Sequence, residues 1–440
     1  MRQLSKISSL VLLIATNAAW ADDWPQWLGP SRDGVWRETN IVRDFPDKGL
    51  QIRWRSPIGI GYAGPAVVGD RVYVLDYELS EGEIQNNPGN RVELKGSERV
   101  VCLDANNGKI IWQHAYPRSY RLSYPSGPRC TPTVADGKVY ALGAEGDLIC
   151  LDAENGNKIW SRQLQDDFDT EAPIWGFAAH PLVDGKHLYC IVGGEGSVAV
   201  AFDKDTGEEI WRALSSISQG YCPPTMITHA GKKQLLIWHP MSINSLNPTS
   251  GEVHWSIPLQ PSYEMSITAP QLYGDLLYAS AIGHVGALFK LDRSGHGAEV
   301  IWRGQTKMGV YSCNTTPIIE DGVIYGVDCM KGAMMAVRLN DGHRLWETIQ
   351  PTTGGERRAS HGTAFMVRHE NGYFLFAETG DLILARLSPD KYHEISRFHV
   401  LEPTNECFGR SVVWSHPAFA NRCLYVRNDQ EIVCVNLAAR

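Results

Sequence analysis

A short phrase recurs along this chain and limits its fold more than any other feature. Each copy has an apolar strand, an Asp or Asn, a turn that ends in Gly, and a second strand that ends in Trp. Successive terminal Trp residues lie 44–51 residues apart. A period of this length with short strands predicts a β-propeller, in which each copy builds one blade of four strands. The repeated residues are Trp112, Trp160, Trp211, Trp255, Trp302 and Trp346.

Each copy also opens in a similar way. A small or polar residue precedes Pro, an apolar pair follows, and a two-residue turn leads into an alternating strand. Asp136-Gly137, Asp184-Gly185 and Asp321-Gly322 predict tight hairpin turns, because Gly adopts a positive φ at little cost. Eight copies can be counted, at residues 62–113, 126–162, 178–213, 221–257, 266–304, 313–348, 361–398 and 411–437.

The eighth copy stops after its third strand, and the other end of the chain offers the missing one. Gly49–Trp54 also runs from a Gly through a short strand to a Trp. We therefore predict that residues 51–55 complete the last blade, which would protect two open sheet edges. The expected fold is all-β, an eight-bladed propeller over residues 51–440 whose ring is closed by an N-terminal strand.

The first residues have the pattern of a secretory signal. Arg2 and Lys6 precede the apolar stretch 10–15, and residues 19–21 read Ala-Trp-Ala, a cleavage pattern. Cleavage after Ala21 would leave a leader at residues 22–50. No Cys follows the cleavage point, so we expect no lipid anchor. The mature chain is expected to be exported, periplasmic or secreted, monomeric, and without a membrane span.

Composition excludes some classes of partner. The 41 basic and 49 acidic residues give a net charge of −8, and no long basic run is present. Nucleic-acid binding is not expected, because phosphate contacts need clustered cations.

The ten Cys residues bear on disulfides and metals. Cys102, Cys150 and Cys434 occupy one position of a repeated strand, where Cys acts as a small apolar residue. Cys423 would face Cys434 if Asn428-Asp429 were the turn between them, and a disulfide is then possible. No Cys-x-x-Cys-His or zinc-type spacing occurs, so neither covalent haem nor zinc is indicated.

Two other segments are assigned structural roles. The polar stretch 78–98 is interpreted as a surface insertion between the second and third strands of the first blade. Gly59–Gly64 fits G-x-G-x-x-G, but Pro65 and a strand follow it, so no helix N-terminus is available for a phosphate. The terminal Trp residues are expected to pack between neighbouring blades.

Chemistry is expected at the channel mouth, where the loops between blades and the turns between second and third strands meet. A carboxylate and an amide there could hold a hard cation, and a carboxylate beside a flat cofactor could act as a base. The alternative is that they are solvated turn residues and loop-capping histidines. The candidates are Arg129, Glu145, Trp175, His180, Glu195, Tyr221, His284, Asn314, Asp328, His361 and Glu378.

The Ala-x-x-Gly-x-x-x-Trp pairs over residues 51–437 resemble the pyrroloquinoline-quinone (PQQ) repeat of quinoprotein dehydrogenases and of the assembly factor BamB. The leader at Asp23–Val35 is similar to that of exported bacterial PQQ-like repeat proteins. The resemblance implies one of two functions. The favoured one is a non-catalytic binding or scaffold module that holds a protein partner or a small ligand on the channel-mouth face, and the alternative is a PQQ- and calcium-dependent oxidoreductase of alcohols or sugars.

Proteins with these two functions differ in sequence features that can be sought in this chain. Quinoprotein alcohol dehydrogenases carry two adjacent Cys beside the cofactor, and no two Cys are adjacent here; BamB proteins are lipoproteins. If the oxidoreductase function held, Arg129 would pair with cofactor carboxylates, Trp175 would stack, and Glu145 and Asn314 would ligate Ca²⁺. The Trp24–Trp36 leader could leave the central channel open or plug it.

Overall fold

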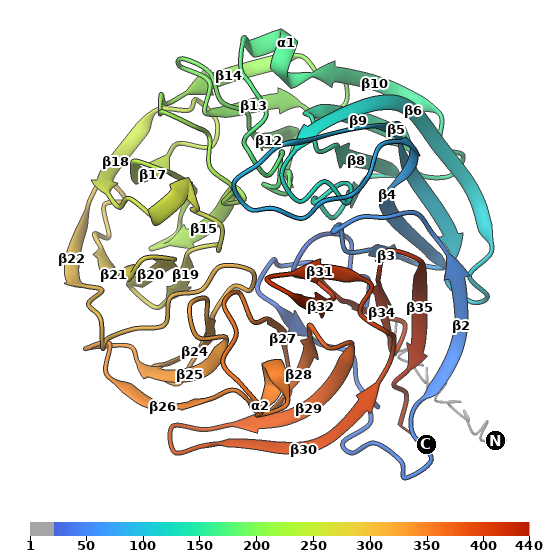
Figure 1. The fold of residues 1–440 in the computed structure, drawn as a ribbon. Helices are drawn as coiled ribbons and strands as arrows, with labels where there is room; N and C mark the ends of the chain where they lie inside the picture. The colour runs from blue at the N-terminus through green and yellow to red at the C-terminus, as the bar shows by residue number, and fades with distance from the viewer. Residues whose placement is uncertain (1–21, 440) are drawn as a thin grey trace, which may run out of the picture.

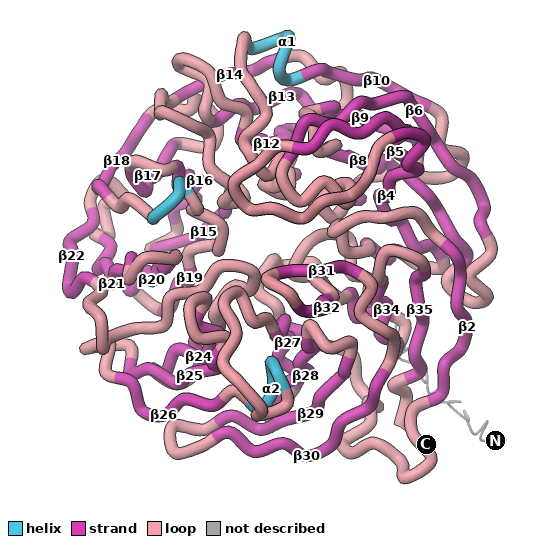
Figure 2. The backbone as a smooth tube through the Cα atoms, viewed as in Figure 1, coloured by secondary structure: helices cyan, strands magenta, loops and turns pink. Residues whose placement is uncertain are grey.

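The computed structural model describes residues 22–439, and strands dominate this part of the chain. The signal peptide expected at residues 1–21 lies outside the described residues. Helix is confined to two short helices and one 3-10 turn (Figure 2). None of the described helices is long and apolar enough to cross a membrane. The helical segments are α1 (Leu164–Phe168), α2 (Gln350–Thr353) and η1 (Ser262–Glu264).

The strands form four-stranded antiparallel sheets that follow one another around a common centre, from blue to red in Figure 1. This all-β arrangement is that of a β-propeller. The first sheets contain β3 (Ala66–Val68), β4 (Arg71–Glu81), β5 (Val92–Asp104) and β6 (Ile110–Leu122); β7 (Thr133–Ala135), β8 (Lys138–Leu142), β9 (Asp147–Asp152) and β10 (Lys158–Gln163); β11 (Leu182–Asp184), β12 (His187–Ile191), β13 (Ala199–Asp203) and β14 (Glu209–Ala213); β15 (Thr225–His229), β16 (Lys232–His239), β17 (Ser242–Leu246) and β18 (Val253–Pro258).

The second half of the chain continues the pattern, and a separate two-stranded hairpin precedes the last sheet. These sheets contain β19 (Gln271–Tyr273), β20 (Leu276–Ala281), β21 (Val285–Leu291) and β22 (Ala298–Arg303); β23 (Ile318–Glu320), β24 (Val323–Asp328), β25 (Ala333–Arg338) and β26 (Arg344–Thr348); β27 (Ala364–His369), β28 (Gly372–Ala377), β29 (Asp381–Leu387) and β30 (Tyr392–His399); β33 (Ala418–Ala420), β34 (Cys423–Arg427), β35 (Glu431–Asn436) and β2 (Gln51–Pro57); the hairpin is β31 (Asn405–Cys407) with β32 (Arg410–Val412).

The recurring Asp-Gly-Trp phrase has a packing explanation. Gly156 has a φ of +74°, and a Cβ there would lie 2.5 Å from the Trp112 ring of the preceding sheet, so only Gly fits. Trp112 Nε1 donates to the carbonyl of Ala153 at 3.2 Å. The prediction that these Trp residues pack between neighbouring sheets is thereby confirmed. The same Gly contact is made by Trp54 with Gly108, Trp160 with Gly207, and Trp211 with Gly251.

The N-terminal strand β2 pairs with the last strand β35 in antiparallel register, with Trp54 opposite Cys434. The condition for Cys423 to face Cys434, a two-residue turn at Asn428-Asp429, is not met. Arg427 pairs with Ile432, so the hairpin loop has four residues and the register moves by two. Cys423 therefore opposes Asn436 instead of Cys434, and both thiols are free.

The polar stretch 78–98, expected as a surface insertion between the second and third strands, consists largely of extensions of those two strands. β4 and β5 continue through it, and only residues 82–91 connect them. Asn86 Nδ2, in this connection, donates to Asn405 Oδ1 at 2.6 Å and to the carbonyl of Glu406 at 2.9 Å. The lengthened hairpin thus reaches from the first sheet to the β31–β32 hairpin (Figure 1).

The leader packs into the centre of the molecule. Trp24 and Trp36 are both 2% exposed. Trp24 exchanges backbone hydrogen bonds with Val67 of β3, and the carbonyl of Pro25 accepts from Val134 of β7. β1 (Val35–Trp36) adds to β27 as a parallel fifth strand. The leader therefore joins the inner strands of sheets that are far apart in the sequence.

Candidate functional site

A cavity of about 620 Å³ lies where the segments that lead into the innermost strands meet. We call it the central pocket. Its lining comes from the approach to every sheet, and Pro88 and Gly89 of the 82–91 connection contribute at its rim. Aromatic side chains dominate the wall. They are Tyr62, Tyr124, Trp175, Tyr221, Tyr263, Phe365, Phe408 and Trp414.

A leader tryptophan, Trp27, packs against two histidines that line the central pocket. The Trp27 ring stacks on His180 with centroids 4.8 Å apart, and its Nε1 donates to His416 Nε2 at 3.3 Å. The backbone N–H of Thr131 donates to His180 Nδ1 at 2.9 Å. Because each imidazole accepts a hydrogen bond, both rings are neutral. The leader thus contacts two residues that line the pocket.

Burial agrees with the neutral state of both rings. It lowers the pKa of His180 well below its usual range, where His416 and Arg32 act in the same direction. It lowers the pKa of His416 to about 3, although that ring is partly open to the pocket. Protonation of the accepting nitrogen of either ring would remove its hydrogen bond from Trp27 or from Thr131.

We expect a pH-dependent stability difference between the wild type and His416→Asn, in which an amide oxygen can still accept from Trp27. The folded pKa of His416 is lowered, so between about pH 6.5 and pH 3 the unfolded chain binds more protons than the folded chain. The stability of the wild type relative to the variant should therefore fall by up to about 2 kcal/mol from pH 6.5 to pH 5. Urea unfolding of both proteins at pH 6.5 and at pH 5 measures this change in relative stability. A difference that is constant with pH would contradict the neutral, buried ring.

Arg129 is the single Lys, Arg, Asp or Glu among the lining residues of the described chain. Its guanidinium lies 5.3 Å from the centre of the Tyr62 ring. It donates to the carbonyls of Gly127, Ser123 and Tyr124, the last at 2.6 Å. Arg129 therefore holds the 123–129 loop and gives the pocket a positive edge.

The sequence candidates divide into two groups in space. One group lines the central pocket: Arg129, Trp175, His180, Tyr221, Asn314 and His361. The other does not: Glu145, Glu195, His284, Asp328 and Glu378. Glu195 and His284 are exposed in turns, which fits the alternative that these candidates are solvated turn residues.

The three buried carboxylates of the second group have partners within the protein. Glu145 accepts from the Arg121 backbone N–H at 2.7 Å, and burial raises its pKa. Asp328 accepts from the Lys331 backbone N–H at 3.1 Å, and burial raises its pKa as well. Glu378 accepts from Arg410 Nε at 2.7 Å. These groups stabilise loops behind the pocket wall.

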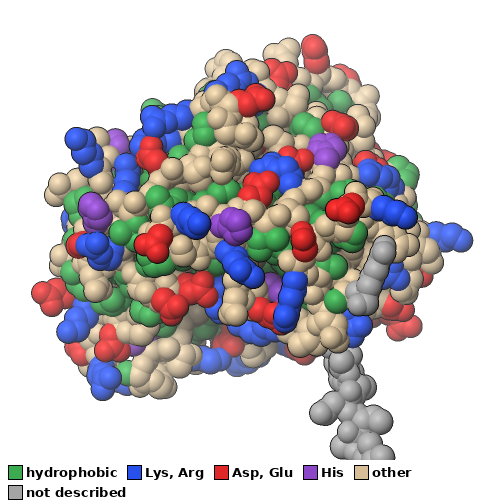
Figure 3. All heavy atoms as spheres, turned by 90° about the horizontal axis from the view of Figure 1, so that it is seen from below, with side chains coloured by type: hydrophobic (Ala, Val, Ile, Leu, Met, Phe, Trp, Pro, Cys, Tyr) green, Lys and Arg blue, Asp and Glu red, His purple; other side chains and the backbone are tan. Residues whose placement is uncertain are grey.

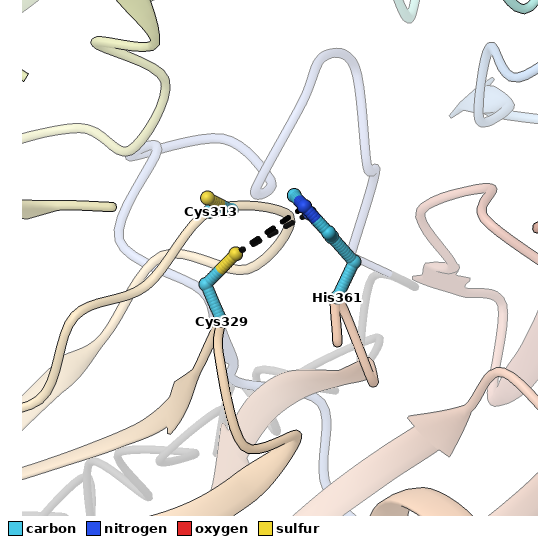
Figure 4. A group of neighbouring side chains, drawn as sticks. All are labelled: Cys313, Cys329 and His361. Carbon is cyan, nitrogen blue, oxygen red and sulfur yellow. Dashed lines mark hydrogen bonds between the residues drawn. The ribbon is translucent and has the colours of Figure 1, made fainter. Parts of the chain in front are cut away.

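A cluster of Cys313, Cys329 and His361 lies at one side of the pocket, drawn in Figure 4. Their ligand atoms all lie within 4.8 Å of one another, and Cys329 Sγ is 3.3 Å from His361 Nδ1. Hydrogen bonds from Cys313 and then from His361 lower the pKa of Cys329 to about 6. Burial raises the pKa of Cys313 well above its usual value.

Comparison with known proteins identifies the family. The model of the family described as outer membrane protein assembly factor BamB matches residues 96–348. The chain belongs to this BamB family of PQQ-like repeat proteins. No curated protein matches it.

Solved structures share the fold of this BamB-family chain at low identity. BamB from Moraxella catarrhalis is 14% identical with a TM-score of 0.56, over 88% of this chain and 99% of that one. A europium-containing methanol dehydrogenase is 12% identical with a TM-score of 0.60, over 92% and 89%. A quinohemoprotein alcohol dehydrogenase from Comamonas testosteroni is 13% identical with a TM-score of 0.59, over 97% and 82%. At these identities only the fold is shared.

The central pocket of this BamB-family chain does not fit a calcium-bound quinone. Calcium takes six to eight oxygen ligands, usually including carboxylates. No carboxylate is among the described lining residues, and Glu145 points to Arg121 and Gln165 instead. Arg129 is already bound to three carbonyls. Of the four residues expected for a cofactor, Arg129, Trp175 and Asn314 line the pocket, and Glu145 does not.

The sequence analysis missed several lining residues, and one of them carried a usable signal. His416-Pro417 repeats the His180-Pro181 opening of an earlier copy, so His416 could have been placed beside His180. Tyr124 and Phe408 lie between copies, and Trp414 precedes the first strand of the eighth copy, where the repeat gives no register. The Cys cluster was missed because its members are 16 and 32 residues apart and meet only in the fold.

Proposed function

We propose that the mature chain is an exported, monomeric binding module whose central pocket holds a small aromatic, mainly apolar ligand. The observation that carries the proposal is the aromatic pocket, whose lining residues His180 and His416 are held by Trp27 of the leader. Ligand sites are typically concave, mostly apolar and furnished with few polar groups. A volume of about 620 Å³ suits a drug-sized molecule.

The wall chemistry supports this class of ligand. Trp175 and Tyr221 lie with ring centroids 5.5 Å apart, so a planar group can extend an existing aromatic contact. Phe408 stacks on His361 at 5.3 Å on another side. Arg129 would favour an anionic substituent at the rim. No carboxylate is among the described lining residues, so the carboxylate base expected for a dehydrogenase has no candidate there.

The architecture that supports the pocket belongs to the same proposal. After removal of residues 1–21, the leader 22–50 plugs the channel, and residues 51–440 form eight blades. β2 serves as the outer strand of the last blade, as its pairing with β35 supports. Trp54 donates to the carbonyl of Ala105 at 2.8 Å, the contact that other Trp residues make with the next sheet. The surface seen in Figure 3 carries interspersed charges of both signs, consistent with a partner other than nucleic acid.

The test uses anilinonaphthalene sulfonate, an aromatic anion whose fluorescence rises on binding. We expect saturable one-to-one binding to the native protein. Trp175→Ala, which removes a wall ring, and Ala178→Phe, which fills the pocket, should each weaken it at least about tenfold. Tyr273→Ala is the matched control, since Tyr273 is an exposed aromatic residue on β19 outside the pocket. Circular dichroism verifies that each variant is folded.

Two results would overturn the proposal. If anilinonaphthalene sulfonate did not bind saturably, or bound equally well to Trp175→Ala and Tyr273→Ala, the central pocket would not be the binding site. Tight calcium-dependent binding of PQQ, with dye reduction by alcohols or sugars, would replace a binding module with an oxidoreductase.

A further inference from the structure

We propose that Cys313, Cys329 and His361 bind one thiophilic metal ion, Zn²⁺, at the wall of the central pocket. This site is independent of the aromatic ligand and goes beyond the binding function above. The three side chains come from three separate segments: the approach to β23, the end of β24, and the approach to β27.

The distances suit a tetrahedral ion. With Zn–S near 2.3 Å and Zn–N near 2.0 Å, ligand atoms around a tetrahedral zinc lie roughly 3.5–3.8 Å apart. The Cys329 Sγ to His361 Nδ1 distance is 3.3 Å, and no pair in the cluster exceeds 4.8 Å. Small side-chain rotations would therefore bring all three atoms onto one ion.

The backbone holds the ligands in place without a metal. The Cys329 N–H donates to the carbonyl of Tyr311 at 2.7 Å, and the His361 N–H donates to the carbonyl of Cys329 at 2.6 Å. His361 has a φ of +58°, a strained conformation for this residue type. Its ring stacks on Phe408, with 14° between the planes. The fold thus fixes the histidine directly against the thiol.

The surroundings leave one coordination position open. Cys313 and Cys329 are each 2% exposed and pack against Met265 and Ile282, so water reaches the sulfurs poorly. His361 lines the pocket. An ion held by these three groups would face the pocket with its fourth position, as zinc sites with three protein ligands do. Two sulfurs and an imidazole disfavour calcium and magnesium, which prefer oxygen.

The experiment uses the mature chain stripped with a chelator and kept reduced. Titration with Zn²⁺ against a chromophoric chelator should give one ion per chain, and Co²⁺ should give a thiolate-to-metal absorption band. Cys329→Ser and His361→Ala should each weaken Zn²⁺ binding at least about 100-fold. Zn²⁺ should raise the melting temperature of the wild type and leave that of both variants unchanged.

Cys407→Ser is the matched control, because Cys407 is another buried thiol near the pocket, 3.6 Å from the Tyr124 hydroxyl. It should keep full Zn²⁺ affinity. The proposal fails if the reduced wild type takes up no stoichiometric Zn²⁺, or if Cys329→Ser binds as tightly as Cys407→Ser. Binding of Cu⁺ without Zn²⁺ would overturn the choice of ion. A Cys313–Cys329 disulfide that forms in the purified protein, with no Zn²⁺ uptake after reduction, would overturn the site.

Discussion

Replacing Arg427 with alanine is expected to lower the free energy of unfolding by about 3–5 kcal/mol, since the change empties a buried site and leaves several acceptors unpaired. Arg427 is 0% exposed at the end of β34. It donates to the carbonyls of Leu75 at 2.8 Å and Gly59 at 2.5 Å, and to that of Asn428 at 3.0 Å. The first two belong to the other end of the chain, so one side chain ties the last sheet to the first.

Arg427→Lys separates charge from geometry. An ammonium keeps the charge but cannot reach three divergent carbonyls as a planar guanidinium does, so we expect an intermediate loss. Arg386→Ala is the control, since Arg386 is exposed on β29 and should change stability by less than about 0.5 kcal/mol. Urea unfolding measures all three. If Arg427→Ala and Arg386→Ala had the same midpoint, the joint between the first and last sheets would be unimportant for stability.

Trp27→Ala is expected to cost about 3–5 kcal/mol, the usual range for a buried Trp. Trp27 is 4% exposed, and its loss would leave a cavity beneath the pocket and remove the donor to His416. The same variant should bind anilinonaphthalene sulfonate less tightly, because the inner wall of the pocket would no longer be fixed.

Trp27→Phe tests which part of the ring matters. It can still stack on His180 but cannot donate to His416, so a loss of about 1–2 kcal/mol is expected. Arg37→Ala, an exposed substitution in the same leader, should be nearly neutral because its ion pair with Asp33 is on the surface. Equal melting temperatures for Trp27→Ala and Arg37→Ala would show that the leader does not support the channel.

The repeat predicted the sheets well because each repeated residue has a local task. Gly156 must be Gly against Trp112, and the turns at Asp136-Gly137 and Asp321-Gly322 have a positive φ at both residues. The turn predicted at Asp184-Gly185 was wrong by one residue, because Asp184 pairs with His187 and the turn is Gly185-Lys186. The turn after β34 was misplaced because an Asn-Asp pair suits either a two-residue or a four-residue loop. There, the Asn428 side chain accepts from Gln430 and Glu431, which stabilises the longer loop.

The candidate site was predicted only in part, for a similar reason. Of the eleven candidates chosen by loop position, six line the pocket, Trp175 and Asn314 among them. Loop position does not give the direction of a side chain. Glu145 follows the same pattern, yet a backbone N–H and an amide of its own neighbourhood bind it instead. These local hydrogen bonds direct Glu145 away from the pocket, so the carboxylate expected to ligate calcium is not there.

The contact of Trp54 with Ala105 and the pairing of β2 with β35 affect how this protein can come apart. A linear stack of repeats can fray from either end, one interface at a time. Here β2 pairs with β35 of the last sheet, and Trp54 of β2 bonds Ala105 beside the first sheet, so these two sheets cannot separate without breaking one of these contacts. Amide hydrogens of the first and last sheets should therefore exchange as slowly as those of the middle sheets.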